Sequence, residues 1–134
     1  MRRTTMSRGK TSLALMFVFI PLFFLALAVA ENSQAQAQGI WPWTSYRLVE
    51  ESDLGPLSLR DLEIMRNEIY ARKGWIFARA DLNGYFNSQP WYRPGGPPWD
   101  RERVNRMAEA SLSPLERQNI SRISSYERFR RGGR

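Results

Sequence analysis

The sequence contains no cysteine and no histidine. Without cysteine the protein has no disulfides, no thiolate zinc site, no cysteine nucleophile and no lipid-modified cysteine of a lipoprotein. Without histidine it also lacks the commonest general base and the commonest metal ligand of proteins. Catalysis would have to depend on carboxylates, hydroxyls, tyrosines or Lys73. We therefore expect no metal site, no cofactor and no catalytic residue.

An alternation of polar and apolar residues, which indicates strands, is missing after residue 37, and no internal repeat is visible. Apolar residues recur instead at helical spacing in several short segments. A chain of 134 residues has room for one small domain. The sequence predicts an all-α fold, a small bundle of three to four short helices with aromatic-rich loops, after an N-terminal signal peptide.

Residues 1–37 have the three parts of a secretory signal peptide. A basic stretch comes first, an apolar run occupies residues 13–30, and small residues suited to cleavage follow. Two Ala-x-Ala sites end at Ala30 and Ala37, and we favour the second because a polar segment separates it from the apolar run. The alternative is an uncleaved membrane anchor, because the run reaches the length of about 18 residues that can span a bilayer. Pro21 and the paired sites weigh against an anchor.

The net charge of +7 comes mainly from the two ends of the chain. Between Thr44 and Glu127 basic and acidic residues are equal in number, so the folded part is close to neutral. A nucleic-acid-binding protein would carry a basic face on its folded surface. We therefore expect no nucleic-acid partner, and we interpret the basic C-terminal tail, residues 128–134, as a solvated end that frays.

An aromatic segment with Trp41 and Trp43 follows the leader. We interpret residues 38–56 as a linker and an extended aromatic arm that lies over the core. The alternative is an exposed strip of aromatic side chains that docks a partner.

The clearest helix is predicted over residues 59–73. Ser58, followed by an aspartate three residues later, resembles a capping box, and Gly74 supplies the stop. Glu68 and Arg72 lie four residues apart, so we expect one face of the helix to be ion-paired and wet. The apolar residues of the opposite face recur at helical spacing: Leu59, Leu62, Met65 and Ile69.

Two shorter helices are predicted after it. The first covers residues 80–86 and ends before Pro90, because the residue that precedes a proline is pushed out of the helical region. A loop rich in proline and glycine follows. The second covers residues 101–110, with Val104 and Met107 as its strong apolar residues.

The last helix has three start signals in agreement. Ser113 is an N-cap residue, Pro114 suits the first helical position, and Glu116 suits the third. Its inner face is predicted from residues that follow at helical spacing: Leu115, Asn119, Ile120, Ile123 and Tyr126.

The run RNEIYARKG at residues 66–74 resembles the signature of the YARHG domain, a module of bacterial exported proteins. Further blocks follow in the family's order: Phe77, the YF pair at 85–86, the WY pair at 91–92 and SPLERQNI at 113–120. The resemblance covers residues 57–127, which we assign to a YARHG-like domain. It implies export and fold more than chemistry, because no enzymatic activity is established for the family. Lys73 stands where the name-giving histidine would be, so the resemblance supplies no titrating imidazole here.

Six residues are candidates for a binding site. A guanidinium, an amide and a phenol on one helical turn suit an anionic or sugar ligand, and paired aromatics beside a loop suit stacking on a glycan. The alternative is structural: Arg66 and Asn67 brace the last helix, through Asn119, and the aromatic side chains pack in the core. The candidates are Arg66, Asn67, Tyr70, Arg72, Trp91 and Tyr92.

Two classes of function follow. The first is a non-enzymatic cell-envelope module, periplasmic or extracellular. It would bind either a cell-wall polymer such as peptidoglycan or another envelope protein. It would contact a membrane only if the leader is not cleaved. The alternative is a cell-wall hydrolase with two carboxylates, Glu68 with Glu63 or Glu116. We favour binding, because these acids all lie beside arginines in the sequence.

Overall fold

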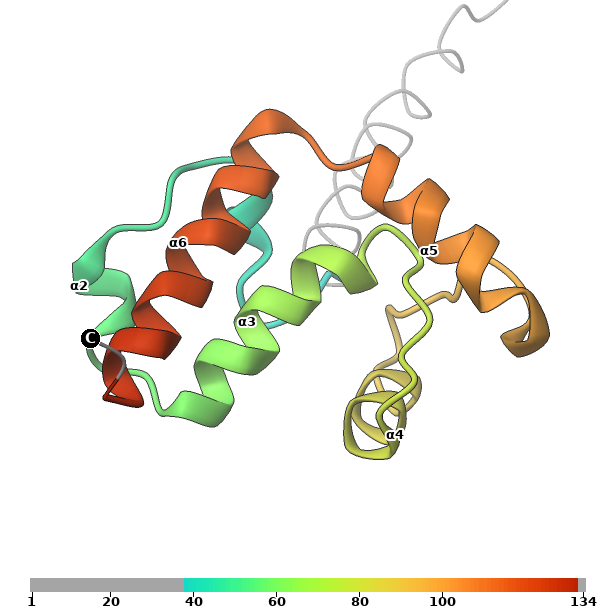
Figure 1. The fold of residues 1–134 in the computed structure, drawn as a ribbon, viewed down its shortest axis with the longest axis horizontal. Helices are drawn as coiled ribbons and strands as arrows, with labels where there is room; N and C mark the ends of the chain where they lie inside the picture. Colours follow the sequence, from blue (N-terminus) through green and yellow to red (C-terminus); the bar gives the residue numbers. More distant parts are fainter. Residues whose placement is uncertain (1–37, 133–134) are drawn as a thin grey trace, which may run out of the picture. The chain divides into compact units, whose positions relative to one another are not determined.

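The computed structural model describes residues 38–132, and these residues form helices and connecting loops without a strand (Figure 1). The all-α prediction is confirmed. The predicted signal peptide and its cleavage sites lie outside the described residues, apart from Gln38, the first residue after the second site. Within residues 38–132 no helix combines the length and apolarity needed to cross a membrane. The elements are η1 (Pro42–Ser45), α2 (Glu51–Leu54), α3 (Leu59–Ala71), α4 (Ala80–Asn87), η2 (Pro98–Asp100), α5 (Arg101–Ala110) and α6 (Pro114–Arg130), where η marks a 3-10 helix.

Both predicted capping boxes form. The backbone N–H of Asp61 donates to the Ser58 hydroxyl at 3.0 Å, and the Asp61 carboxylate accepts from the Ser58 backbone at 3.0 Å. Ser113 and Glu116 make the same exchange at the start of α6, at 3.1 and 2.8 Å. These bonds satisfy N–H groups that a helix start leaves without partners, so the sequence alone fixes where α3 and α6 begin.

Helix α3 ends at Ala71, two residues before the predicted end, and the turn that follows closes at Gly74. The φ of Gly74, +83°, lies in the left-handed region that favours glycine. A Cβ atom at this position would lie 2.8 Å from the backbone nitrogen of Gly95, which donates a hydrogen bond to the Gly74 carbonyl. The turn after α3 therefore needs both the conformational freedom and the small size of glycine.

The first hydrophobic core lies between α3 and α6, which run side by side in Figure 1. Leu62, Met65 and Ile69 of α3 are fully buried with Ile123 of α6, and Leu59 and Tyr70 flank them. The apolar face predicted for α3 is confirmed. Three residues from outside the two helices complete the core: Val49, Leu54 and Leu112.

A second core lies against another face of α3, and it corrects the prediction of a wet face. Ile64 and Ala71 pack there with the aromatic residues of the α4 region. The ion pair of Glu68 and Arg72 is present at 3.7 Å, but the two side chains are only 1% and 6% exposed. The helix is central to the fold, so it has no broad solvent face. The remaining members of this core are Phe77, Leu82, Phe86 and Tyr92.

Residues 38–50, which we call the arm, lie over the first core. Trp41 and Trp43 pack against that core, in agreement with the packing interpretation. The arm is not simply extended, because it contains η1, and the single turn of α2 that follows was not predicted. Asn119 attaches the arm to α6. Its amide nitrogen donates to the carbonyls of Thr44 and Arg47, and its amide oxygen accepts from the backbone N–H of Val49, all at 2.8 Å.

Of the two strong apolar residues of α5, only Val104 is buried. Met107 is 59% exposed, and Ala108 is buried beside Val104 instead. The helix presents its small residue to the interior because Ala108 follows Val104 by four positions, one turn on. The basic tail begins as helix, because α6 continues through Arg130, and its described residues, 128–132, are all exposed to solvent, as expected of a solvated end. That this end frays stays a prediction.

Candidate functional site

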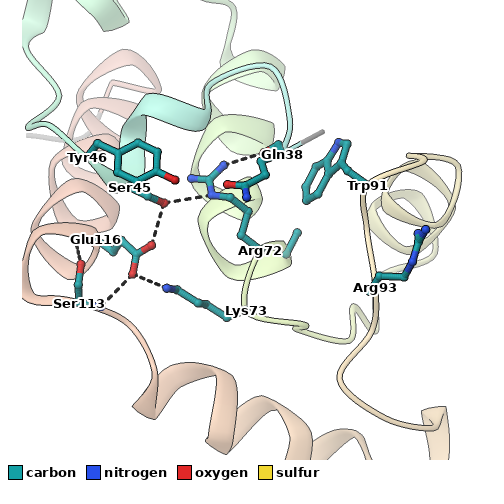
Figure 2. Close-up of a pocket in the computed structure, with 10 residues that line it drawn as sticks. Gln38, Ser45, Tyr46, Arg72, Lys73, Trp91, Arg93, Ser113 and Glu116 are labelled. Carbon is teal, nitrogen blue, oxygen red and sulfur yellow. Dashed lines mark hydrogen bonds and ion pairs between the residues drawn. The ribbon is translucent and has the colours of Figure 1, made fainter. Parts of the chain in front are cut away.

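A cavity of about 520 Å³ opens beside Lys73, where the arm, the end of α3, the segment after α4 and the start of α6 meet (Figure 2). We call it the Lys73 cavity. Its volume lies within the range of about 300–1,000 Å³ that is common for small-ligand sites. The lining is mostly polar or charged, with two aromatic rings: Gln38, Ser45, Tyr46, Ala71, Arg72, Lys73, Trp91, Arg93, Ser113 and Glu116.

Glu116 is at the centre of the polar contacts on one side of this cavity. Its Oε2 lies 2.9 Å from the Lys73 ammonium and accepts from the Ser113 backbone at 2.8 Å. Its Oε1 accepts from the Ser45 hydroxyl, also at 2.8 Å. The Glu116 side chain is 3% exposed, so these three donors replace the water that its charge would otherwise need. Figure 2 shows that the donors come from three different segments.

The electrostatics of Glu116 follow from these contacts. Burial alone would raise the pKa of Glu116, but the hydrogen bonds from Ser113, Lys73 and Ser45 together outweigh it. The pKa of Glu116 therefore lies below its ordinary value, and the group is a carboxylate at neutral pH. Its three donors hold this carboxylate in place where the arm, α3 and α6 meet.

Arg72 connects the cavity to the arm. Its guanidinium donates from Nε to the Ser45 hydroxyl at 3.1 Å, from Nη1 to the Gln38 carbonyl at 3.1 Å, and from Nη2 to the Thr44 hydroxyl at 2.6 Å. Burial lowers the pKa of Arg72, and the nearby Glu68 carboxylate opposes that effect. An arginine nevertheless stays protonated in proteins. Arg72 thus places a fixed positive charge at the cavity wall, and its hydrogen bonds attach the arm to α3.

Glu68 holds the arm from the same helix. Its two carboxylate oxygens accept from the backbone N–H groups of Ile40 and Trp41, at 2.7 and 2.9 Å. The side chain is completely buried, and burial raises the pKa of Glu68 above its ordinary value despite these hydrogen bonds. This carboxylate therefore fixes the backbone of the arm to α3.

The structure brings together only some of the six predicted binding residues. Arg72 and Trp91 line the Lys73 cavity. Tyr92 lies behind it in the second core, where its hydroxyl donates to the Trp75 carbonyl at 2.6 Å. Tyr70 packs on the other core and stacks at a tilt on Trp75, with ring centroids 4.9 Å apart. Tyr70 and Tyr92 are therefore packing residues.

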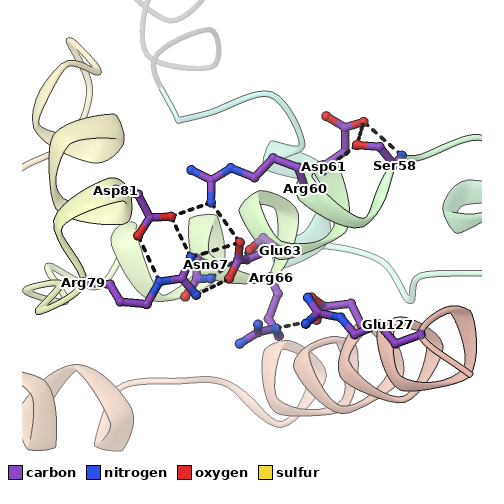
Figure 3. A network of polar contacts seen from close by, with 10 residues as sticks. Ser58, Arg60, Asp61, Glu63, Arg66, Asn67, Arg79, Asp81 and Glu127 are labelled. Atoms are coloured by element: carbon purple, nitrogen blue, oxygen red, sulfur yellow. Dashed lines mark hydrogen bonds and ion pairs between the residues drawn. The ribbon is translucent and has the colours of Figure 1, made fainter. Parts of the chain in front are cut away.

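Arg66 and Asn67 are not among the residues that line the cavity. Figure 3 shows them with their own polar partners. Arg66 braces the last helix as the structural interpretation supposed, through an ion pair of 2.7 Å with Glu127 of α6. Asn67 does not reach Asn119. It donates instead to the Glu63 carbonyl one turn earlier in its own helix, at 2.8 Å. The contacts of Arg66 and Asn67 thus support α3, and neither residue lines the cavity beside Arg72.

A second polar network links α3 to the start of α4 (Figure 3). Arg60 donates to both Glu63 and Asp81 at 2.8 Å, and Arg79 donates to the same two carboxylates. The Arg79 guanidinium, and to a smaller extent Arg60, hold the pKa of Glu63 below its ordinary value. The two arginines balance the two acids, so this cluster offers no free carboxylate.

Sequence reasoning missed Gln38, Ser45, Tyr46, Arg93, Ser113 and Glu116 as cavity residues. The sequence marks Ser113 only as a helix start, and Glu116 as a helix start and as a candidate carboxylate of the alternative hydrolase. Gln38, Ser45, Tyr46 and Arg93 lie in segments without helical periodicity. The available signal was Lys73, the one departure from the family motif, because its partner in space is the capping glutamate of α6. Nowhere in residues 38–132 do three or more carboxylates gather as potential metal ligands.

Comparisons with known proteins identify one family. The family model described as the YARHG domain matches residues 37–128, well over half of the chain. The match begins before residue 57, where the resemblance inferred from the motifs begins, and it includes the whole arm. Neither the curated proteins nor the solved structures gave a match.

Proposed function

Because this chain belongs to the YARHG domain family, we propose that it is an exported, non-enzymatic binding module of the bacterial cell envelope. The leader supports export, since residues 1–37 have the basic, apolar and cleavage segments of a signal peptide. Residues 38–132 supply the binding surface. The partner is a cell-wall polymer, of which peptidoglycan is the leading candidate, or another envelope component of the same chemistry.

The Lys73 cavity is the observation on which this proposal rests. It combines a cationic lining, contributed by Arg72, Lys73 and Arg93, with the rings of Tyr46 and Trp91. Cationic and aromatic side chains around one concave site are typical of binding sites for polar, ring-containing ligands. No other cavity found in the described residues pairs two aromatic rings with charged groups that are buried and fixed.

The alternative, a hydrolase with two carboxylates, has little support. A pair of acids would have to flank one scissile bond, and one of them would need an accessible proton. Glu68 accepts two backbone hydrogen bonds, Glu63 pairs with two arginines, and Glu116 has three donors. These fixed partners favour a role in stability for all three acids, and so favour binding over catalysis.

Export is tested by N-terminal sequencing of the protein recovered from the periplasm or the medium of a producing bacterium. We expect the mature chain to begin near Gln38. A membrane-bound species that retains Met1 through Ala30 would mean that the leader is an anchor.

Binding is tested by co-sedimentation of the exported form with purified, insoluble cell wall. We expect the wild type to sediment, Trp91→Ala to remain in solution, and Trp99→Ala to behave as the wild type. Trp99 is the matched control because it is 86% exposed and lines a different cavity. Release of soluble sugar reducing ends during the incubation would contradict the non-enzymatic assignment, and failure of the wild type to sediment would contradict binding.

A further inference from the structure

The charges that line the Lys73 cavity favour an anionic ligand. Arg72, Lys73 and Arg93 are cationic, and Glu116 is the only acid of the lining. Both oxygens of Glu116 are occupied by donors from Ser45, Ser113 and Lys73. The positive end of the α6 dipole also lies at this side, because Ser113 caps that helix. A bound anion would therefore meet a net positive environment.

Lys73 is the anchor best placed for that anion. Its ammonium has three donors and makes one ion pair, to Glu116, and its side chain is 25% exposed. Arg72 is more fully engaged, because it makes three hydrogen bonds to the arm. Arg93 is exposed to solvent and donates from Nη1 to the carbonyls of Pro90 and Tyr92, so Lys73 is the more sheltered of the two cations that have donors to spare. Among residues 38–132 the Lys73 ammonium has no other partner, so its remaining donors can hold a carboxylate.

Trp91 supplies a fixed ring on the other side of the cavity. It packs edge-on against Phe86 of the second core, with centroids 6.2 Å apart and planes at 80°. Figure 2 shows its indole directed toward Gln38 and Arg72. A partly buried indole that is held by the core is a stacking surface for the apolar face of a sugar ring.

Two neutral groups suit the hydroxyls of such a ring. The Gln38 amide and the Tyr46 hydroxyl line the cavity, and neither makes a side-chain hydrogen bond within residues 38–132. Each can both donate and accept, as sugar hydroxyls require. We infer that the Lys73 cavity binds a carboxylate-bearing sugar unit of an envelope glycan, with the carboxylate at Lys73 and the ring on Trp91. This inference rests on the proposed function.

The test is calorimetric titration of the exported form with N-acetylmuramic acid and with N-acetylglucosamine. The two sugars share a ring and differ by a lactyl ether that carries the carboxylate. We expect wild type to bind the acidic sugar at least about tenfold more tightly, the difference that one good charge-assisted contact produces. Lys73→Gln should remove that preference, and Lys73→Arg should keep most of it. The wild-type comparison alone decides the matter if Lys73→Gln fails to fold.

The outcomes separate this inference from the proposed function. Equal binding of the two sugars, or binding of insoluble wall but of neither sugar, overturns the carboxylate-sugar assignment and leaves the module intact. Tighter binding of an acidic peptide than of either sugar would contradict the assignment of a glycan ligand and favour a protein partner. Binding of neither wall nor sugars overturns both proposals.

Discussion

One amide side chain, that of Asn119, joins the last helix to the arm. It is completely buried and makes three hydrogen bonds of 2.8 Å, to Thr44, Arg47 and Val49. Asn119→Ala would leave three backbone groups without partners, so we expect a loss of about 3 kcal/mol or more in the free energy of unfolding. Denaturant titration of the two proteins measures it.

Asn67→Ala is the matched control at the same residue type. Asn67 is also buried, but its one hydrogen bond goes to the Glu63 carbonyl within α3. Alanine is the better helix former, so this variant should stay within about 1 kcal/mol of the wild type. A larger loss for Asn67→Ala than for Asn119→Ala would contradict the assignment of the arm contact to Asn119.

At the scale of elements, the turn after α3 is the most constrained connection. Gly74→Ala forces a side chain into a positive φ and places a Cβ atom 2.8 Å from the Gly95 nitrogen. We expect a loss of about 2 kcal/mol or more in unfolding free energy, because strain and displacement of the loop add. A thermal melt will record the lowered midpoint.

The same glycine-to-alanine substitution at Gly84 should have the opposite effect on the free energy of unfolding. Gly84 lies inside α4, and a Cβ atom there would meet nothing within 4 Å. Alanine in a helix interior should raise the unfolding free energy by about 0.5–1 kcal/mol. If both variants melt at the wild-type midpoint, the turn after α3 is not the constraint described above.

The helices were predictable from sequence because their ends are encoded locally. Ser58 and Ser113 each have an acid three residues later, and Gly74 follows the last helical turn, so each signal lies within a few residues of its effect. The second buried face of α3 was not predictable in this way. Ile64 and Ala71 are too few to form a second stripe, and their burial depends on residues 77–92, which the periodicity of α3 does not specify.

The site was predictable only where it overlaps the motif. Arg72 and Trp91 were identified from residue chemistry, and both line the cavity. The residues that fix it, Ser45 and Glu116, lie 71 positions apart and meet only through the tertiary fold. Arg66 and Asn67 were overinterpreted because helical spacing shows which side chains are neighbours, not which surface they face.

At the scale of the whole molecule, carboxylates set the response to acid. Hydrogen bonds hold the pKa values of five carboxyl groups below their ordinary range, and burial raises that of Glu68. A lowered pKa contributes stability that is present above the unfolded value of about 4 and is lost as the pH falls. The raised pKa of Glu68 has the opposite effect on stability, but it concerns a single group. The five groups are Asp53, Asp61, Glu63, Asp81 and Glu116.

We therefore predict that the free energy of unfolding decreases as the pH falls from 7 to about 3. Glu116 should account for much of the decrease, because its side chain is only 3% exposed, whereas the ion pairs of Asp53 and Asp81 are more exposed and screened by solvent. Glu116→Gln should be less stable than wild type at pH 7 and less sensitive to acid. Denaturation at several pH values measures both. An increase in stability toward pH 3 would show that Glu68 dominates.

The central claim is that the Lys73 cavity binds envelope glycan through Trp91. Indole N–H resonances of the exported form, assigned from tryptophan variants, report on this ring directly during titration with soluble fragments of purified cell wall. We predict that the Trp91 resonance shifts as the fragments bind, while that of the exposed Trp99, which lines another cavity, stays in place. Binding that leaves the Trp91 resonance unchanged, or that shifts Trp99 instead, would contradict the claim.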